Sequence, residues 1–496
     1  MLDKDKLNLC ILIFISLLLS IYLLSHTYVI SMDGAFQYIP IAKDFAKGLY
    51  QKGLSNTQQP LYSFLIAFVY RWIPDLEISG RLVSSVFGIL LVFPVYFLGK
   101  WIFDKNIAFL STLLVCIHPY IRRFSADVLK ESTYLFFLIS SICISWKILQ
   151  NKNKFSYILV SIFTAISYLV RADGMEVIIG LLIFILFIKR FDSLKERGIS
   201  ILLLLSTFFL LLSPYFLFLR ELRGEWFWNN AKPLSILLGL KEGGNDTFLT
   251  YKIITSLKKL NFEILSIFHP LYLFLVVLGL MKRLLSPFKE GEKYLLIFIV
   301  IHYLLLFLLI LNFTDWSINH GERVWMFSGR HVLPLLIFSI YWAGEGLRSI
   351  SQWVQKRFEQ KSLFSWSQGK VVGILVVIFL LAIVLPKTLK TQRYDRLTEK
   401  WAGFWIKNRF GEGVQIMTTL PRVAYYANGN LKLINLKKEE FDSIQSDFLN
   451  NQNLILVLRN TEAPSLRHKL IKKYFIEINR FENDGMEKII LFQRIK

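Results

Sequence analysis

The sequence has 496 residues, of which 54% are hydrophobic and 15% aromatic, and its formal net charge is +22 at pH 7. This many apolar residues, arranged in long unbroken runs, exclude an ordinary soluble globular protein and indicate a polytopic α-helical membrane protein. Because membrane proteins collect Lys and Arg in cytoplasmic loops, the basic excess needs no nucleic acid partner, and we predict none.

Eleven apolar segments are predicted to span the membrane as helices. The first has a longer apolar core than a cleaved signal peptide, so we expect an uncleaved span. The stretch 60–73 is apolar but short, and we predict an interfacial or re-entrant helix there, within the first outer loop. The predicted spans are 9–28, 82–99, 107–120, 132–149, 156–170, 175–188, 199–219, 263–281, 294–311, 332–347 and 371–387.

The charges of the loops predict the orientation of the chain. With the N-terminus in the cytoplasm, every cytoplasmic loop is basic, from Lys100 and Lys105 after the second span to Arg348, Lys356 and Arg357 before the last. This bias agrees with the positive-inside rule. We therefore predict a protein of the plasma (inner) membrane with a cytoplasmic N-terminus, which places the first loop on the outer face.

The last hundred or so residues differ from the rest of the chain. Strand-like and helix-like segments alternate there, a pattern typical of a small α/β domain. We predict a membrane domain over residues 1–388 and an extracytoplasmic α/β domain over 389–496. The alternating segments are VQIMTT, RVAYYANG, LKLINL, KEEFDSIQSDF, NLILVLRN, SLRHKLIKKY, FIEINRF and EKIILFQRI.

Charged and aromatic residues gather in the predicted outer loops. Carboxylates can activate an attacking hydroxyl, Arg and Lys can hold a phosphate, and aromatic rings such as Trp226, Trp228 and Trp316 can stack on a sugar. The mixture fits an enzyme that takes a group from a phosphate at the level of the lipid headgroups. The charged residues are Asp33, Asp44, Arg122, Arg123, Asp127, Lys130, Glu131, Arg171, Asp173, Glu322, Arg323, Arg330 and His331.

The order and spacing of several segments resemble the GT-C glycosyltransferases, above all the protein O-mannosyltransferase and aminoarabinose transferase branch. The resemblance covers most of residues 1–390, and the tail is similar too. It implies a membrane enzyme that takes a hexose or pentose from a polyprenyl-phosphate carrier on the outer face and passes it to an acceptor, usually with inversion. The resembling segments are MDGAFQYIPIAKDFAKG, QQPLYSFLIAF, GRLVSSVFGILLVFPVYFLGK, HPYIRRFSADVLKESTYLFF, RADG and GRHVLPLL.

The resemblance also implies roles for single residues. Asp33 matches the catalytic acid of the first loop, and Glu131 matches the acid of the second outer loop, where many relatives have Asp. Asp127 lies four residues before Glu131 and would share its face if the segment is helical. Arg171 matches a basic position after the fifth span. We predict Asp33 as the catalytic base, with Glu131 and Asp127 as further catalytic acids.

One position departs from the pattern. Where aminoarabinose-transferase-like relatives carry a Lys before paired prolines, this chain has Gln58-Gln59-Pro60. Other cations must then hold the donor phosphate, and we predict Arg171, Arg330, Arg123 and Lys130 for that role. We predict that Gln59, Tyr62 and Asp173 bind the acceptor or the sugar. The acceptor is a lipid-linked glycan, a lipid or a protein hydroxyl, and membrane lipids surround the chain.

Each of these residues also has a purely structural interpretation. Asp33 could cap the helix that begins at Gly34, a contact worth about 1 kcal/mol. Glu131 could cap a helix or pair with Lys130 or Arg123, because acids are favoured at helix starts. The cations could extend to the lipid headgroups. A divalent cation between the acids is an alternative, and no other cofactor is predicted.

Three other functions stay open at the level of the sequence. The chain could be a transporter of polysaccharide or lipid-linked glycan, although no internal repeat is visible and the charges lie at one mouth rather than in mid-span. It could be a glycan polymerase or ligase that uses a diphosphate-linked carrier. It could also be a non-catalytic scaffold that binds partners through its outer domain.

Overall fold

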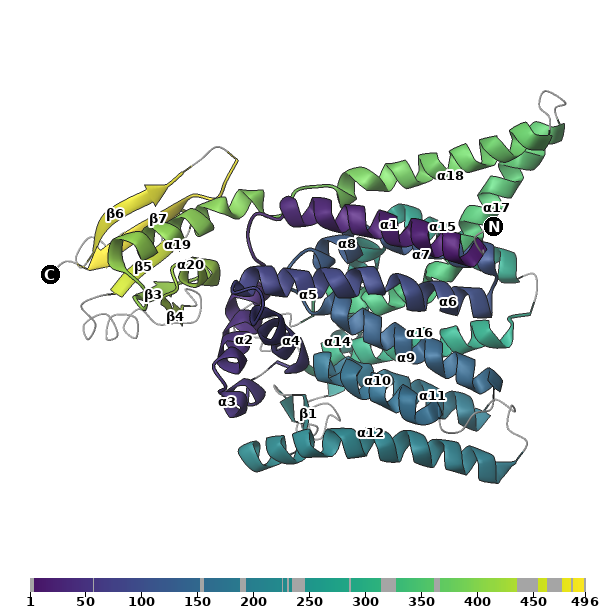
Figure 1. Ribbon diagram of the computed structural model, residues 1–496, viewed down its shortest axis with the longest axis horizontal. Coiled ribbons are helices and arrows are strands. Elements are labelled where there is room, and N and C mark those ends of the chain that lie inside the picture. Colours follow the sequence, from purple (N-terminus) through teal and green to yellow (C-terminus); the bar gives the residue numbers. More distant parts are fainter. Residues whose placement is uncertain are drawn as a thin grey trace.

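The computed structural model describes residues 4–56, 58–151, 156–187, 193–224, 226–229, 232–233, 246–284, 287–313, 327–360, 366–434, 454–461, 475–482 and 485–494. Several predicted features lie outside these residues, namely Trp316, Glu322, Arg323 and the segments KEEFDSIQSDF and SLRHKLIKKY. The described chain forms a bundle of long helices with a small mixed sheet at one end (Figure 1).

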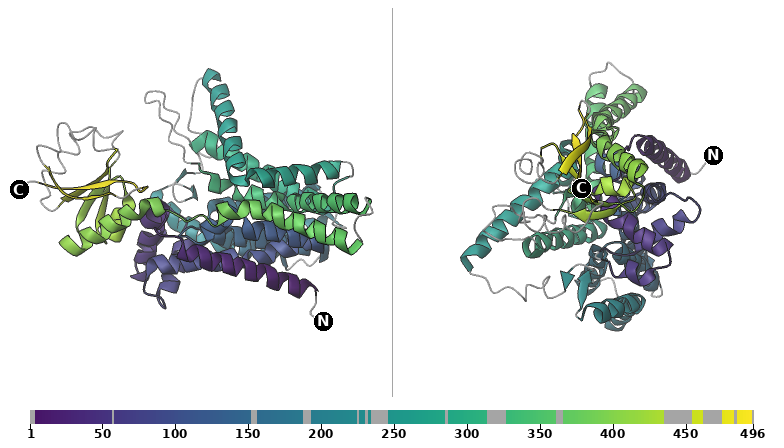
Figure 2. Two further views of the ribbon diagram at one scale, coloured as in Figure 1. Left: turned by 90° about the horizontal axis from the view of Figure 1, so that it is seen from above. Right: turned by 90° about the vertical axis from the view of Figure 1, so that its left-hand side faces the viewer.

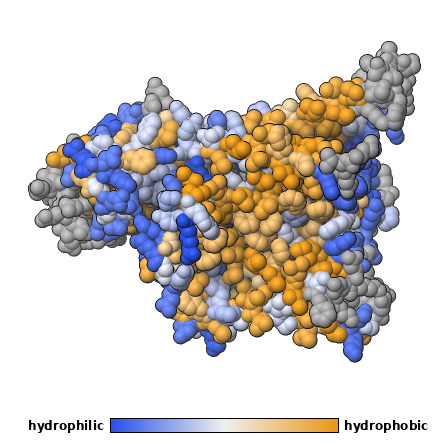
Figure 3. All heavy atoms as spheres, viewed as in Figure 1, coloured by the Kyte–Doolittle hydropathy of each residue, from blue (hydrophilic) through white to orange (hydrophobic). Residues whose placement is uncertain are grey.

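Long apolar helices build the bundle and run roughly along one axis (Figure 1). Apolar side chains cover the middle of the molecule, whereas polar ones gather towards both ends (Figure 3). Such a belt is what contact with lipid tails requires. The bundle helices are α1 Lys4–Ser25, α5 Leu76–Leu90, α6 Val92–Ile102, α7 Lys105–Ile117, α9 Glu131–Asn151, α10 Ser156–Val170, α11 Glu176–Phe187, α12 Leu194–Arg223, α15 Pro270–Leu284, α16 Glu290–Phe313, α17 Leu333–Gln360 and α18 Trp366–Thr388.

The number of membrane spans is smaller by strict criteria than the sequence predicts. Among the described helices, six are long and apolar enough to cross a bilayer, and up to eight if two bent pairs each count as one span. The count of eleven therefore stays a prediction.

The predicted span 263–281 is not one continuous helix, because the chain there bends by 100° between α14 (Asp246–Phe268) and α15. His269 leaves the helix with φ 59°, and Pro270 has no N–H to continue the helical ladder. In Figure 2, α14 accordingly departs from the direction of the bundle. A similar break of 59° separates α7 from the short helix α8 (Pro119–Ser125), again at a proline.

Short helices fill the first loop and lie at the end of the bundle that faces the sheet (Figure 1). The stretch predicted as interfacial or re-entrant holds only the ten-residue helix α4, which is too short to span a bilayer. A small hairpin of β1 (Phe227–Asn229) and β2 (Lys232–Pro233) follows α12. The loop helices are the π-helix η1 Gly34–Tyr38, α2 Ile39–Ala46, α3 Tyr50–Leu54 and α4 Leu61–Tyr70.

The chain after α18 forms a five-stranded sheet in the order β4-β3-β5-β7-β6. Strand β3 pairs in parallel with β4 and β5, while β7 is antiparallel to β5 and β6. Two helices pack on one face of the sheet, α19 through Ala402 and Ile406 and α20 through Val423. The elements are the 3-10 helix η5 Tyr394–Arg396, α19 Leu397–Phe410, β3 Gln415–Thr418, α20 Pro421–Tyr426, β4 Asn430–Leu433, β5 Leu454–Arg459, β6 Phe475–Phe481 and β7 Ile489–Arg494.

The sheet domain docks on the start of the first loop. The N–H of Tyr28 donates to the Gln392 carbonyl at 3.2 Å, and the N–H of Gln392 donates to the His26 carbonyl at 3.0 Å. The N–H of Ile30 donates to the Tyr426 hydroxyl at 3.0 Å. These contacts fix the chain just before Asp33.

Arg122 binds three helices together inside the bundle. Its side chain is fully buried, with Nη1 2.5 Å from the Ser16 Oγ on α1 and Nη2 2.9 Å from the Gly88 carbonyl on α5. The interpretation that Arg122 extends to the lipid headgroups is therefore wrong. The break between α7 and α8 turns this side chain inward, where it stabilises the packing of α8.

Candidate active site

Four short turns meet at the end of the bundle beside the sheet domain. They are the start of η1, the start of α9, the 3-10 turn η2 (Ala172–Met175) and the 3-10 turn η4 (Gly329–Val332). Each turn places charged side chains at a helix end. The structure thereby brings together Asp33, Glu131, Arg171 and Arg330, which are far apart in the sequence.

Arg330 lies between two of the predicted catalytic acids. Its Nη1 forms an ion pair with Asp33, and its Nε lies 3.4 Å from Glu131 Oε1. The Asp33 and Arg330 side chains are 24% and 27% exposed, whereas Glu131 is 2% exposed. Burial alone would lower the pKa of Arg330, but Glu131, Tyr38 and Asp33 outweigh it and raise that pKa. Arg330 is therefore a permanent cation between Asp33 and Glu131.

Asp33 does not act as a helix cap. It has helical backbone angles, and its side chain accepts no capping hydrogen bond from η1. The Gly34 N–H instead donates to the Ser31 hydroxyl at 3.0 Å. Gly34 also has to be a glycine, because a Cβ there would lie 2.7 Å from the Ser31 Oγ and 2.9 Å from Val128. The capping interpretation of Asp33 is therefore wrong, and its carboxylate is directed to Arg330.

Glu131 is the first residue of α9 and lies deeper than Asp33. Both of its carboxylate oxygens are buried and make no hydrogen bond to any described residue. Its ionic partner is Arg330, rather than Lys130 or Arg123. A buried carboxylate with unsatisfied oxygens is unfavourable by itself, so this position is suited to a ligand that donates hydrogen bonds.

Lys130 lies beside the residue that replaces the lysine of the relatives. Its Nζ donates to Gln58 Oε1 at 2.9 Å and is 5.7 Å from the centre of the Tyr38 ring. Burial and the neighbouring Arg171 and Arg330 lower the pKa of Lys130 to about 8. The ammonium of Lys130 thus lies beside Gln58, the position where the relatives carry a lysine.

Arg171 and Asp173 form a buried pair within the RADG turn. Arg171 Nε lies 2.6 Å from Asp173 Oδ2, and the guanidinium is 5.2 Å from the centre of the Tyr134 ring. Burial would lower the pKa of Arg171, but Asp173, Tyr134 and Glu131 together raise it. The Arg171 Nη2 is buried without a hydrogen-bond partner among the described residues. Asp173 therefore orients Arg171 and leaves one donor for a ligand.

The residues predicted to contact the acceptor or the sugar lie on the inner side of the first loop. Gln59 Oε1 accepts from the Tyr215 hydroxyl at 3.0 Å, and its Nε2 is buried with no partner in the described part of the chain. Tyr62 is fully buried, and its hydroxyl lies 2.7 Å from the Ser84 Oγ. Its ring packs edge-on against Tyr38 at 5.1 Å. Tyr62 therefore supports the site from below and offers no surface to a sugar.

Asp127 and Arg123 lie in a different cluster. The prediction that Asp127 shares a helical face with Glu131 is wrong, because residues 126–130 are not helical and α9 begins only at Glu131. Asp127 Oδ1 accepts from the N–H of Ser31 at 3.1 Å, and Oδ2 pairs with Arg393. The charged neighbours of Arg123 are Arg393 and Asp127. Both residues therefore tie the first loop to the start of the sheet domain.

Sequence reasoning missed three residues that face the site or support it. Tyr38 lies among the charged residues, and burial raises the pKa of its phenol well above the ordinary value, so it stays protonated. Glu176 and His302 form a buried pair behind the turns, with 2.5 Å between Oε2 and Nδ1. Glu176 and His302 could have been found from the sequence, because they are an acid and a histidine within apolar spans, where ionisable residues are rare.

The described acids and histidines do not form a metal site. Among the residues that the structure describes, no group of three or more His, Cys, Asp or Glu side chains converges on one point. Arg330 occupies the space between Asp33 and Glu131 and already supplies positive charge there. The alternative of a divalent cation between the acids therefore does not fit this donor set.

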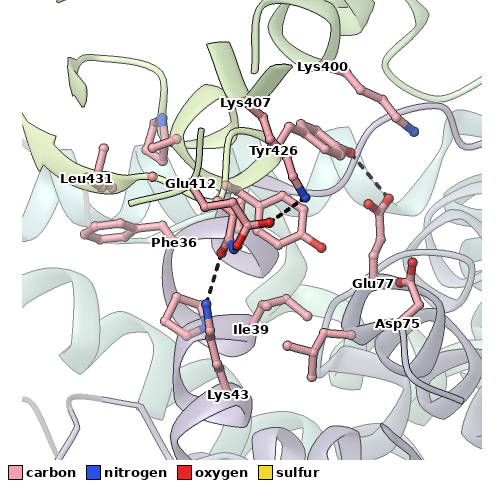
Figure 4. A pocket seen from close by; sticks show the side chains of 18 of the residues that line it. Phe36, Ile39, Lys43, Asp75, Glu77, Lys400, Lys407, Glu412, Tyr426 and Leu431 are labelled. Carbon is pink, nitrogen blue, oxygen red and sulfur yellow. Dashed lines mark hydrogen bonds and ion pairs between the residues drawn. The ribbon is translucent and has the colours of Figure 1, made fainter. Parts of the chain in front are cut away.

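A separate cavity of about 920 Å³ lies between the first loop and the sheet domain (Figure 4). Lys43 Nζ donates to Asn428 across it at 3.0 Å, and the Tyr426 hydroxyl donates to Glu77 at 3.4 Å. Neither Asp33 nor Glu131 lines this cavity. Its lining includes Phe36 of η1, Lys43 of α2 and Lys400 of the sheet domain.

The chain has the GT-C fold of membrane glycosyltransferases, and the family match and the similar structures confirm the resemblance predicted from the sequence. Residues 57–218 match the family described as dolichyl-phosphate-mannose-protein mannosyltransferase. A search of curated proteins found no match.

Several solved structures are similar to this chain. ArnT from Cupriavidus metallidurans in the apo state is 11% identical, with a TM-score of 0.60, and the match covers 99% of this chain and 98% of that one. ArnT from the same organism bound to undecaprenyl phosphate is 10% identical, with a TM-score of 0.53 and 97% of each chain covered. The oligosaccharyltransferase AglB from Archaeoglobus fulgidus, in complex with an inhibitory peptide and a dolichol-phosphate, is 11% identical, with a TM-score of 0.55, over 100% of this chain and 75% of that chain. These likenesses establish the fold.

Proposed function

We propose that this protein is a membrane glycosyltransferase that moves a sugar from a polyprenyl-phosphate carrier to an acceptor hydroxyl. The observation that carries the proposal is the bridge that Arg330 forms between Asp33 and Glu131, with Lys130 and Arg171 beside it. Cations that can hold a phosphate thus lie next to a carboxylate that can take up a proton. The similar ArnT and AglB structures contain undecaprenyl phosphate and dolichol-phosphate, which supports a lipid-phosphate carrier.

The cations have hydrogen-bond donors available for a phosphate. Arg171 Nη2 is a buried donor without a partner among the described residues, and the Lys130 ammonium contacts only a neutral amide in the described hydrogen bonds. Charge-assisted hydrogen bonds to phosphate are among the stronger contacts in proteins. We infer that Arg171, Lys130 and Arg330 bind the donor phosphate, while Arg123 supports the loop from the Asp127 cluster.

The proposed reaction is a single displacement. The acceptor oxygen attacks the anomeric carbon, the bond from that carbon to the phosphate oxygen breaks, and the configuration inverts. Asp33 takes the proton of the acceptor hydroxyl, and the polyprenyl phosphate leaves with the bonding electrons. In the resting site Arg330 pairs with Asp33. Arrival of the donor phosphate would draw Arg330 away and free the carboxylate to act as a base.

The deeper polar groups would bind the sugar. The oxygens of Glu131 and the Gln59 Nε2 are buried without hydrogen bonds to described residues, and sugar hydroxyls can donate to the first and accept from the second. Asp173 acts through Arg171, which it orients. Asp127 acts through the first loop, which it holds at Ser31.

The proposed orientation places the site on the outer face of the plasma membrane. The N-terminal end of α1 lies at the other end of the bundle, where Asp5 contacts Lys100 at 2.6 Å and Lys105 at 3.2 Å. The sheet domain stands beside the site (Figure 1) and would be extracytoplasmic. A lipid-linked glycan, a lipid or a protein hydroxyl can serve as the acceptor there.

Mass spectrometry of glycans and lipids in a deletion strain tests the proposal. The strain is complemented with the wild type, with Asp33→Asn, or with Asp44→Asn as a control. Asp44 is an acid of the same loop that pairs with Lys52 at 2.9 Å. We expect that the deletion lacks one sugar mass, that the wild type and Asp44→Asn restore it, and that Asp33→Asn does not. Full restoration by Asp33→Asn would remove its role as a base, and loss of whole repeating units would favour a polymerase or ligase.

A further inference from the structure

A chain of buried polar contacts runs behind the site through four elements. The Tyr134 hydroxyl on α9 donates to Glu176 Oε1 on α11 at 3.3 Å. Glu176 Oε2 lies 2.5 Å from His302 Nδ1 on α16. His302 Nε2 lies 2.9 Å from the carbonyl oxygen of His331 in η4. Tyr134, Glu176 and His302 are each at most 1% exposed.

The partners of His302 determine where its hydrogen atoms lie. A carbonyl oxygen can only accept, so Nε2 carries a hydrogen and donates it to His331. The contact between Nδ1 and the Glu176 carboxylate needs a second proton on one of the two atoms, because two acceptors cannot form a hydrogen bond. Wherever that proton resides, the pair as a whole is neutral. A neutral pair can be buried in a membrane bundle at far lower cost than either charge alone.

Each link of this chain lies next to a charged residue of the site. Tyr134 is one turn after Glu131 on α9, and its ring carries the Arg171 guanidinium at 5.2 Å. Glu176 begins α11 directly after the η2 turn. His331 follows Arg330, whose side chain reaches Asp33 and Glu131. The buried contacts therefore connect the backbone positions of Glu131, Arg171 and Arg330.

We propose that His302 and Glu176 are positioning residues for the transfer reaction, a role that rests on the proposed function. They hold the η4 turn in the position from which Arg330 contacts both Asp33 and Glu131. Three observations support this role: the contact to the His331 carbonyl, the complete burial of the pair, and its place beside the apolar stretches of α11 and α16. The hydrogen bonds described for His302 and Glu176 reach neither Asp33 nor Glu131, so neither residue is assigned a chemical step.

Purified variants test the proposal by transfer rate and by hydrogen exchange. His302→Leu removes both contacts, and His302→Gln keeps a donor that can reach the His331 carbonyl. Tyr294→Phe is the matched control, because it removes a buried hydrogen bond to Ser145 from the same helix, away from η4. We expect His302→Leu to lower the rate about 10- to 100-fold, since small misplacements of reacting groups have effects of this size. His302→Gln should recover most of that loss, and Tyr294→Phe should stay within about threefold.

A double-mutant cycle separates positioning from general damage. If His302 acts through Arg330, then Arg330→Ala combined with His302→Leu should be as slow as Arg330→Ala alone, within about threefold. A loss equal to the product of the two single losses would overturn the proposal.

Hydrogen exchange gives a readout that needs no activity. We expect faster exchange of the amides of residues 327–333 in His302→Leu and no change there in Tyr294→Phe. Unchanged exchange in His302→Leu would reject the positioning role. Should the wild type transfer no sugar from polyprenyl-phosphate mannose or polyprenyl-phosphate aminoarabinose, the proposed function would lose its support, while the exchange data would still decide whether His302 holds the turn.

Discussion

The two ends of the helical bundle both carry charges, but they place them differently. At the N-terminal end, Asp5 pairs with Lys100 and with Lys105, whose side chain is 50% exposed. At the other end, Glu131 is 2% exposed and its oxygens lack hydrogen bonds to the described residues. Ion pairs near the surface contribute at most about 1 kcal/mol, whereas a buried polar group that lacks hydrogen bonds is unfavourable by about 1–3 kcal/mol. The first arrangement is what a surface tolerates, and the second is suited to a ligand that donates hydrogen bonds.

Neutralising one acid at each end of the bundle is the strongest test of this difference. Asp33→Asn should lower the rate of sugar transfer by about 10²- to 10⁴-fold, because it removes the proposed base and keeps the size of the side chain. Asp5→Asn should leave the rate within about threefold. Transfer from a labelled polyprenyl-phosphate sugar by the purified proteins measures both. Equal effects at the two ends would contradict the assignment of the site.

Two arginines, one at each end of the bundle, provide a second test of this difference. Arg171→Lys removes the unpartnered Nη2 donor and the contact with the Tyr134 ring. Losing one hydrogen bond to a charged ligand should weaken binding of polyprenyl phosphate about 10- to 100-fold. Arg348→Lys at the other end, where Arg348 pairs with Asp104 at 2.6 Å, should change binding by less than about threefold. A binding titration measures both, and an unaffected Arg171→Lys would place the phosphate elsewhere.

The lowered pKa of Lys130 predicts a pH dependence. Below about pH 8 the ammonium is charged and available to the donor phosphate, and above it the amine becomes neutral. The ratio kcat/KM for the donor should therefore fall as pH rises through about 8, by up to tenfold per pH unit. Lys130→Arg keeps its charge and should abolish this fall. A pH profile that is the same in both proteins would show that Lys130 does not hold the phosphate.

The smallest expected effect concerns stability. Glu131→Gln removes a buried negative charge, so the free energy of unfolding should stay the same or rise by about 1 kcal/mol, although activity falls. Asp5→Asn should lower that free energy by less than about 1 kcal/mol, because its partners are partly exposed. Thermal unfolding in detergent measures both changes. A strong loss of stability in Glu131→Gln would make its role structural.

Particular residues show how far the sequence could predict the site. Asp33, Glu131, Arg171 and Arg330 were predicted together because each follows or precedes an apolar span on the same side of the predicted membrane. Alternate ends of spans must meet on one face, so topology alone gathers these residues. A helical spacing would put Asp127 in this group, but α8 ends at Ser125 and the chain is not helical again until Glu131. Loop geometry of that kind has no period that the sequence reveals.

The sequence by itself determined the membrane class, the short helix after Pro60 and the side of the bundle on which the charges gather, because apolar length and loop charge act locally. Only the tertiary structure decided that Arg330 lies between Asp33 and Glu131, that Lys130 lies beside Gln58, and that His302 reaches the turn of Arg330. Those contacts join residues that are tens to hundreds of positions apart. They depend on how helices rotate and break as they pack, and packing is a property of the whole bundle.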